Sequence, residues 1–287
     1  MTAPFIHDTG DGPALLMLHA FPLDASMWDA QVAWLSGRYR CLRPDFWGCG
    51  ASPVAPGEIG IDGYAATLLE ELDRRGIREF AVCGVSMGGY IALALLRAAP
   101  ARLNALVLAN TRAAADDDTA RAARAAMVDE VRSGGVEAIV EPMTQRLLCA
   151  SCREEVHIAD PVRGRIRRCR PDGLVSAIQA MADRPDSTQL LADIAAPTLV
   201  VCGTADVIVP VEESRAMAAA IPGAALREFE ASAHLANLEQ PHAFSSTLGS
   251  FLDAVGAQPV AGGGGGASGQ PTRGGGDDHP AGAGRGA

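Results

Sequence analysis

At positions 82 to 89 the chain reads Val82-Cys83-Gly84-Val85-Ser86-Met87-Gly88-Gly89. The residues before the serine, 80–85, are β-branched, small or aromatic and predict a buried strand, whereas residues 90–96 repeat apolar side chains at helical spacing. A G-x-S-x-G sequence between a strand and a helix predicts a sharp turn that holds the serine in a strained, exposed conformation. Glycines are needed on both sides because a Cβ there would collide with the neighbouring strand or helix. Ser86 is therefore the candidate nucleophile.

The alternative is a glycine-rich turn that contains a serine by chance. The strand before Ser86 and the helix after it favour the nucleophile. The N-terminus of that helix would also direct its free N–H groups at whatever the serine attacks.

Length and composition indicate one folded domain with a tail. The chain has 287 residues, and residues 256–287 are rich in glycine with almost no apolar side chains. Such a segment cannot offset its ordering entropy by burying apolar surface, so we predict a disordered tail. The remaining stretch of roughly 255 residues suits a single α/β domain with an insertion.

The charged residues exclude two classes of function. The formal net charge is −10, and no predicted helix carries a basic stripe, which argues against a nucleic-acid partner. All 24 basic residues are arginines, so a lysine cannot act as base or form a Schiff base with substrate.

The cysteines indicate the redox environment of the protein and whether it binds a metal ion. The seven cysteines are odd in number and several fall in predicted strands, so they are expected to be buried thiols in a reducing compartment. Cys149-x-x-Cys152 lacks a second pair of ligands, and we predict neither metal nor cofactor.

No apolar run approaches the length of about 18 residues that spans a membrane, and no basic segment precedes the first apolar run. These features predict a soluble, cytoplasmic protein.

Strands and helices alternate along most of the chain. Several predicted strands are wholly apolar, which specifies a mostly parallel, doubly wound sheet covered on both faces. The predicted strands are 14–18, 40–43, 80–85, 103–108, 199–202 and 226–230, and the predicted helices are 27–35, 61–75, 90–96 and 244–255.

One segment interrupts this alternation. Residues 111–192 show helical patterns and no convincing strand, so they are expected to form a helical cap over the carboxyl ends of the strands, where open α/β sheets bind ligands. The domain organisation expected is a core of residues 1–110 and 193–255, a cap of residues 111–192 and a tail of residues 256–287.

A serine hydroxyl needs a base, and the base needs a group that holds its tautomer. Asp206 follows the apolar strand at 199–202, and His234 follows the strand at 226–230. The other histidines lie near the ends, in the insertion, at the start of the last helix or, for His19, in a turn where the side chain is expected to brace the backbone. The order Ser86, Asp206, His234 is the order in which a nucleophile-elbow serine and its partners follow one another in α/β-hydrolases.

Two backbone N–H groups are expected to form an oxyanion hole. One is that of Met87, directly after the serine. The other belongs to the turn after the first buried strand, where Phe21 in His19-Ala20-Phe21-Pro22 is the best candidate.

These residues carry a family resemblance. The chain resembles the α/β-hydrolases, and within them the serine hydrolases similar to 3-oxoadipate enol-lactonase. The matching stretches are 19–28, 84–89, 203–210 and 234–241. The chain departs from many relatives at Ala20 and Ala233, where those have glycine in tight turns, and its short N-terminus suggests that the first strand or two of the usual sheet is missing.

The resemblance implies opening of a small, carboxylate-bearing enol-lactone in the catabolism of aromatic compounds. A broad carboxylesterase or a cofactor-free perhydrolase would use the same machinery, and a binding protein of the same fold without turnover is a further alternative. Ser86 excludes a dehalogenase or an epoxide hydrolase, which would need Asp at that position. The expected partner is a small-molecule ester or lactone, and the sequence leaves the oligomeric state open.

An anionic substrate requires a positive group beneath the cap. The candidates are Arg184, before Pro185, and the arginines between positions 163 and 170. The alternative for both is a surface charge that balances the acidic body of the protein.

Overall fold

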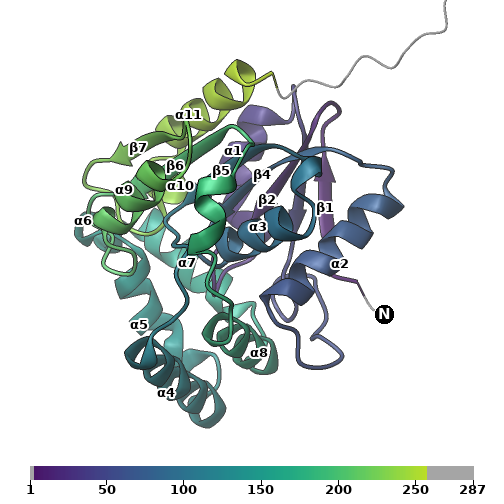
Figure 1. Cartoon of the computed structure of the whole chain (residues 1–287). Helices are drawn as coiled ribbons and strands as arrows, with labels where there is room; N and C mark the ends of the chain where they lie inside the picture. The colour runs from purple at the N-terminus through teal and green to yellow at the C-terminus, as the bar shows by residue number, and fades with distance from the viewer. Residues whose placement is uncertain (1–2, 257–287) are drawn as a thin grey trace, which may run out of the picture.

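The computed structural model of the protein describes residues 3–256 (Figure 1). Its centre is a seven-stranded sheet with the strand order β1-β3-β2-β4-β5-β6-β7. β1 pairs with β3 antiparallel, and the other neighbours pair parallel, so the predicted mostly parallel sheet is confirmed. The strands are β1 (Ile6–Thr9), β2 (Ala14–Leu18), β3 (Arg40–Pro44), β4 (Phe80–Val85), β5 (Leu103–Ala109), β6 (Thr198–Gly203) and β7 (Ala225–Phe229).

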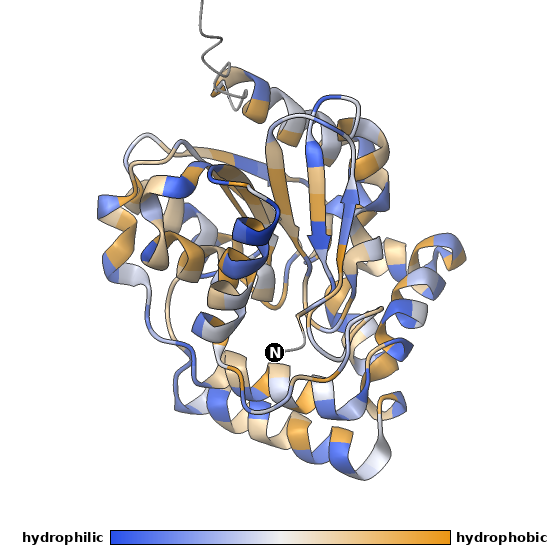
Figure 2. Ribbon diagram, turned by 90° about the vertical axis from the view of Figure 1, so that its right-hand side faces the viewer, coloured by the Kyte–Doolittle hydropathy of each residue, from blue (hydrophilic) through white to orange (hydrophobic). Residues whose placement is uncertain are grey.

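The inner strands are apolar because helices cover both of their faces. Every residue of β2, β4 and β6 is buried, and Figure 2 shows the middle of the sheet as predominantly hydrophobic. Helix α1 packs against α11, and α2 packs against α3, which itself lies on β4. These helices and the one after β6 are α1 (Asp29–Leu35), α2 (Ile61–Arg74), α3 (Met87–Ala98), α9 (Val211–Ala220) and α11 (Pro241–Ala254).

The N-terminal edge of the sheet differs from expectation. The chain has an antiparallel strand, β1, before the first strand that the sequence predicted, so at most one of the two strands suggested as missing could be absent. Only Ile6 of its four residues is buried, so this edge strand lacks the apolar run that reveals the inner strands.

Five helices lie between β5 and β6, in the segment predicted as a cap. Figure 1 shows α4, α5 and α8 gathered at one end of the sheet. The five are α4 (Asp118–Gly134), α5 (Glu137–Leu147), α6 (Ala150–Glu154), α7 (Val156–Arg167) and α8 (Pro171–Ala182). Helix α4 packs against α5 and α8, so the helices support one another as well as the core.

The cysteines correct one expectation. Cys49, in the loop after β3, forms a disulfide with Cys169, which follows α7, although all the cysteines were expected to be free thiols. The two positions are 120 residues apart in the sequence, and only the folding of the inserted helices over the core brings them together. Cys41, Cys83 and Cys202 are free and buried in strands, as predicted.

Two further predictions concern the C-terminal tail and membrane-spanning helices. The predicted disordered tail, 256–287, lies outside the described residues except for Gly256. Among residues 3–256, no helix combines the length and the apolar character needed to cross a membrane.

Candidate active site

Ser86 occupies the turn between β4 and α3. Its backbone angles are φ 54° and ψ −114°. Residues other than glycine adopt such backbone angles at a cost of about 1–3 kcal/mol. Two hydrogen bonds hold this conformation: the Ser86 N–H donates to the Ala109 carbonyl over 3.0 Å, and the Thr111 hydroxyl donates to the Ser86 carbonyl over 2.8 Å. The strain predicted from the G-x-S-x-G sequence is present, but Ser86 is buried rather than exposed as predicted, because the surrounding residues of the cavity cover it.

The glycines around Ser86 are required by space. A Cβ on Gly84 would lie 2.3 Å from the Gly88 carbonyl oxygen, and a Cβ on Gly88 would lie 2.3 Å from the Leu18 carbonyl oxygen. Both contacts involve backbone, which cannot move aside as the end of a flexible side chain can. Helix α3 therefore lies close to both β4 and β2, and this close approach requires the tight turn at Ser86.

Asp206 and His234 come together at the ends of β6 and β7. The His234 Nδ1 lies 2.7 Å from an Asp206 carboxylate oxygen, and both side chains are buried. A buried carboxylate on Nδ1 fixes the tautomer in which Nδ1 carries the proton, which leaves Nε2 free to accept one. His234 also lines the same cavity as Ser86.

The Asp206 carboxylate is held in its charged form. Burial acts to raise the pKa of Asp206, but the charge of His234 and hydrogen bonds from His234, Asn110 and the Ile208 N–H outweigh it, so the pKa is lowered. The N–H groups of Ile208 and Val209 donate to one carboxylate oxygen over 2.8 and 3.1 Å. The carboxylate is thus oriented from two sides.

Asn110 is a site residue that the sequence reasoning missed. It follows β5 with a positive φ of 46°, and its amide donates to Asp206 over 2.9 Å and to the Ala233 carbonyl over 3.1 Å. Asn110 therefore connects the loop that carries Asp206 to the loop that carries His234. The available signal was its place immediately after a buried strand, where the other candidate site residues also occur.

The two backbone N–H groups predicted for the oxyanion hole are free of hydrogen bonds to the described part of the protein. Within residues 3–256, neither the Phe21 N–H nor the Met87 N–H donates to a protein acceptor. Phe21 and Ser86 both line the cavity, and Met87 follows Ser86 at the start of α3. Their role in binding an oxyanion stays a prediction.

His19 braces the backbone, as expected. Its Nδ1 lies 3.0 Å from the Ala20 carbonyl oxygen, and its Nε2 accepts a hydrogen bond from the Phe46 N–H over 2.9 Å. Burial lowers the pKa of His19, which favours the neutral ring that these two bonds require.

The cavity beside Ser86 is formed by core and inserted helices together. Its volume is about 170 Å³. Its wall includes Ser86 and His234 from the core together with residues from α4, α5 and α8, among them Met127, Met143 and Met181. The inserted helices therefore form part of the wall of the space beside the serine.

Three arginines line this cavity: Arg112, Arg124 and Arg146. Arg112 pairs with Glu213 over 3.1 Å, and Arg124 pairs with Asp116 over 2.6 Å. Arg146 is exposed, and within residues 3–256 its side chain makes no hydrogen bond or salt bridge to protein. Its positive charge is therefore available to a ligand.

The structure places Arg184 apart from this wall. The side chain is buried, donates to Asp116, the Met181 carbonyl and the Ala114 carbonyl, and stacks over the Tyr90 ring at 4.1 Å. The predicted substrate-binding residue thus supports Asp116 rather than reaching the cavity beside Ser86. The arginines between 163 and 170 also lie away from this cavity, and several of them pair with surface carboxylates.

The positions of these side chains follow from the topology. The chain leaves β2 toward β3 on one side and returns to β4 on the other, so the strand order reverses between β2 and β4. Ligands bind at such switch points in open α/β sheets. Phe21 follows β2 and Ser86 follows β4, while Asn110, Asp206 and His234 follow the next three strands.

Among the described residues, one cluster could ligate a metal ion. It consists of Cys149, Cys152 and Glu239, whose ligand atoms lie within 4.8 Å of one another. None of the three lines the cavity beside Ser86.

Known proteins support this reading of the fold. The chain is 30% identical over 239 residues to 3-oxoadipate enol-lactonase 2 of Acinetobacter baylyi, an alignment that covers 83% of this chain and 88% of that protein. It is similar to the structure of a thermophilic esterase from Thermogutta terrifontis, with a TM-score of 0.84 and 37% identity over 88% of this chain and 93% of that one. It is also similar to the enol-lactonase of Burkholderia xenovorans, with a TM-score of 0.81 and 28% identity over 87% and 96% of the two chains. The predicted resemblance is confirmed. Because the model of the alpha/beta hydrolase family matches residues 15–247 and the whole site lies within that range, the chain belongs to the alpha/beta hydrolase family.

Proposed function

We propose that the protein hydrolyses a small carboxylic ester or lactone through an acyl-enzyme on Ser86. The observation that carries the proposal is the buried 2.7 Å contact between His234 and Asp206, at the cavity that Ser86 also lines. A strained serine, a histidine of defined tautomer and a buried carboxylate are the parts that serine nucleophilic catalysis requires.

The first half of the reaction forms the acyl-enzyme. His234 Nε2 accepts the Ser86 hydroxyl proton while the Ser86 oxygen attacks the carbonyl carbon of the substrate. The His234 Nδ1–H donates to Asp206 throughout, which stabilises the imidazolium that forms. The oxyanion accepts hydrogen bonds from the Phe21 and Met87 amides, and one donor of this kind is typically worth about 10²–10³ in rate.

The second half releases the product. The His234 imidazolium protonates the leaving oxygen, which in a lactone remains attached to the acyl group. His234 then takes a proton from a water molecule that attacks the acyl-enzyme, and Ser86 recovers its proton when the tetrahedral intermediate collapses. No other proton acceptor is needed at the serine.

We infer that the substrate carries a carboxylate. Arg146 brings an uncompensated positive charge to the cavity wall, and Arg112 and Arg124 add donors beside it. The esterase from Thermogutta terrifontis is described with malate, a dicarboxylate, bound. Together with the two enol-lactonase relatives, these features favour 3-oxoadipate enol-lactone or a similar acid lactone.

A carboxylesterase is the second candidate. It is supported by the 37% identity to the Thermogutta esterase, which exceeds the 28–30% identity to the enol-lactonases above. Both candidates use the same bond-breaking residues and differ only in the substrate that the cavity accepts.

Substitution of the serine tests the shared mechanism. We expect Ser86→Ala to abolish hydrolysis of p-nitrophenyl acetate, and an organophosphonate to label Ser86 in the unmodified protein. His234→Ala should prevent the labelling, because the base is then absent. Substantial hydrolysis by Ser86→Ala would refute the assignment, and an unmodified protein that neither turns over nor labels would instead be a binding protein.

A substrate panel separates the two candidates. The rate constant kcat/KM is to be measured for 3-oxoadipate enol-lactone and for neutral acetate, butyrate and methyl esters. We expect the acid lactone to exceed the best neutral ester by at least about tenfold, which corresponds to about 1.4 kcal/mol. A lactone value equal to or below those of the esters would favour the carboxylesterase.

A further inference from the structure

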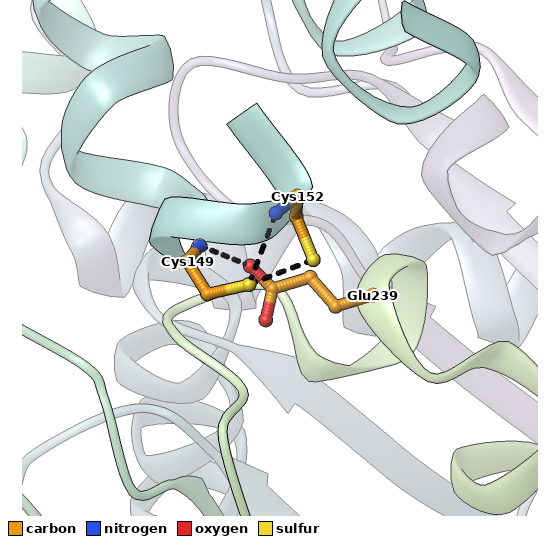
Figure 3. A group of neighbouring side chains, drawn as sticks. All are labelled: Cys149, Cys152 and Glu239. Carbon is orange, nitrogen blue, oxygen red and sulfur yellow. Dashed lines mark hydrogen bonds between the residues drawn. The ribbon is translucent and has the colours of Figure 1, made fainter. Parts of the chain in front are cut away.

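A pair of cysteines lies at the junction between the inserted helices and the core. Cys149 is the residue before α6, and Cys152 lies one turn along it. Figure 3 shows both sulfur atoms beside the carboxylate of Glu239, which comes from α10 (Ala236–Glu239) in the core. The two sulfur atoms are 2.7 Å apart, and the mechanism proposed above uses neither of them.

The geometry suits a disulfide better than a metal site. A disulfide needs a sulfur separation of about 2.05 Å, whereas two thiolates on a tetrahedral zinc ion lie about 3.8 Å apart, as follows from Zn–S bonds of about 2.3 Å. The observed 2.7 Å is closer to the first value. The Glu239 carboxylate also already accepts three hydrogen bonds, from the Cys149 N–H, the Ser232 hydroxyl and the Ala233 N–H.

The environment distinguishes the two sulfur atoms. The Cys149 thiol donates a hydrogen bond to the Cys152 sulfur, and the Cys149 sulfur accepts one from the Cys152 N–H over 3.3 Å. A backbone donor of this kind stabilises a thiolate. Burial, the hydrogen bond with Cys149 and the negative charge of Glu239 raise the pKa of the Cys152 thiol to about 12, so Cys152 keeps its proton. Because the backbone N–H donor faces the Cys149 sulfur, we assign the first attack to Cys149.

Glu239 connects this pair to the candidate active site. One of its carboxylate oxygens accepts from the Cys149 N–H over 2.6 Å. The other accepts from the Ser232 hydroxyl over 2.6 Å and from the Ala233 N–H over 2.5 Å. Ala233 immediately precedes His234, so one carboxylate holds both the cysteine turn and the loop that carries the histidine.

We propose that Cys149 and Cys152 are a redox-active dithiol that a hydroperoxide converts to a disulfide, and that closure of this bond alters the position of the His234 loop through Glu239. The effect on catalysis, but not the dithiol chemistry, rests on the function proposed above.

The chemistry balances with hydrogen peroxide as the oxidant. The Cys149 thiolate attacks one peroxide oxygen, which breaks the O–O bond and gives a Cys149 sulfenic acid and hydroxide, which takes up a proton to become water. The Cys152 sulfur then attacks the Cys149 sulfur, loses its proton and expels the sulfenic oxygen as a second water. Two thiols and one peroxide thus become one disulfide and two waters. A dithiol reductant reverses the change.

Mass spectrometry tests the dithiol directly. Trypsin is expected to release both cysteines in one peptide, residues 147–153, because arginines stand at positions 146 and 153. The full chain is reduced, freed of reductant, treated with hydrogen peroxide and alkylated. We expect this peptide to become lighter by two hydrogens and to resist alkylation, while Cys41, a buried thiol of β3, stays alkylatable once the protein is denatured.

Two results would overturn the proposal. One is a 147–153 peptide that takes two alkyl groups after peroxide treatment, or that oxidises no further than a sulfenic or sulfinic acid. The other is purified protein with bound zinc whose thiols become alkylatable only after a chelator is added, which would make the cluster a metal site. This measurement does not depend on catalysis, so it gives a result even if the protein proves inactive toward esters.

Ester hydrolysis tests the connection to His234. Peroxide should lower kcat for p-nitrophenyl acetate by about fivefold, the lower end of coupling between separate sites, and dithiothreitol should restore it. Cys149→Ser and Cys152→Ser should keep the reduced protein's activity and lose the response, whereas Cys41→Ala should respond like the unmodified chain. Glu239→Gln should still form the disulfide but show a smaller loss of activity. A disulfide that forms without change in kcat would refute the connection to His234.

Discussion

At the scale of single residues, the site depends on two strained positions that hydrogen bonds hold in place. Ser86 and Asn110 both have positive φ, and they follow neighbouring strands of the sheet. Thr111, next to Asn110, donates to the Ser86 carbonyl, while Asn110 itself holds Asp206. One short segment after β5 thus orients both the nucleophile and the acid.

Removal of the Asn110 amide should slow catalysis without weakening substrate binding. For Asn110→Ala we expect kcat to fall about tenfold with little change in KM, because a hydrogen bond to a charged group is worth about 1.5 kcal/mol. The measurement is the steady-state hydrolysis of p-nitrophenyl acetate. Asn104→Ala, at the other end of the same strand, is the control and should leave kcat unchanged. A fall in both variants would indicate a general effect on β5.

The charge of Arg146 should matter only for anionic substrates. Arg146→Gln is expected to raise KM for 3-oxoadipate enol-lactone about fivefold, or about 1 kcal/mol, because an exposed ion pair with the substrate carboxylate is lost. Hydrolysis of neutral p-nitrophenyl acetate should be almost unaffected. Arg132→Gln, on α4 but outside this cavity, is the control. Equal effects of Arg146→Gln on both substrates would contradict a role in carboxylate binding.

At the scale of secondary-structure elements, the close approach of β2, β4 and α3 is what makes the nucleophile turn. It depends on the absence of a side chain at two glycines, Gly84 and Gly88, whose hydrogens face backbone carbonyl groups. The neighbouring elements are buried and apolar, so the sheet and helix have little freedom to separate.

A methyl group at Gly84 should therefore destabilise the protein. We expect Gly84→Ala to lower the free energy of unfolding by about 1–3 kcal/mol or more and to reduce turnover, since the added Cβ would collide with the Gly88 carbonyl. Gly164→Ala is the matched control: Gly164 lies inside α7, where a Cβ would meet nothing within 4 Å. That variant should stabilise by about 0.5–1 kcal/mol. Urea denaturation measures both, and a neutral Gly84→Ala would contradict the packing argument.

At the scale of the whole molecule, several independent contacts fasten the inserted helices to the core. Arg168, after α7, pairs with Asp24 in the core over 2.7 Å, and the Cys49–Cys169 disulfide lies beside this contact in the sequence. The Cys149 N–H donates to Glu239 on another side. Within the insertion, Asp116 binds both Arg124 and Arg184, and Arg184 in turn stacks on Tyr90 of α3 in the core. The inserted helices are thus held to the core by polar contacts and a disulfide as well as by apolar packing.

The Asp116 contact should make stability depend on pH. Burial acts to raise the pKa of Asp116, but Arg124 and Arg184 outweigh it and lower the pKa below the value of about 3.9 expected for the unfolded chain. A carboxyl with a lowered folded pKa contributes its full stability above the unfolded pKa and loses it as the pH falls through the folded pKa.

Asp116→Asn tests this dependence. We expect the substitution to cost about 2 kcal/mol at pH 7, because it leaves two partly buried guanidinium groups without their carboxylate. The difference from the unmodified protein should begin to shrink as the pH falls below about 3.9, where the carboxyl of the unfolded chain becomes protonated, and should be smallest once the pH is below the lowered pKa of folded Asp116. Urea denaturation over this range gives the values. Asp118→Asn, at an exposed position, should change stability little at either pH, and a difference that grew on acidification would reverse the assigned sign.

Much of the fold was readable from local pattern. Buried strands such as β4 and β6 appear in the sequence as largely apolar runs, and Ser86 and Asp206 follow them. His234 follows the mostly exposed strand β7, and the order of the three residues could still be predicted without knowing any distance. Strand β1 was not predicted, because only one of its four side chains is buried and its sequence contains no apolar run.

The local sequence pattern could not predict which distant residues form hydrogen bonds, ion pairs or a disulfide with one another. The sequence specifies that Arg184 follows a helix and precedes Pro185, but only folding places Asp116 against it and leaves Arg146 free at the cavity. The same holds for Asn110 beside Asp206, for Cys49 joined to Cys169 and for Glu239 between Cys149 and the His234 loop. Periodicity and turn chemistry act over a few residues, so they determine the elements and the turn at Ser86. Charge pairing and cavity shape act between residues dozens to more than a hundred positions apart, and these depend on how the elements pack.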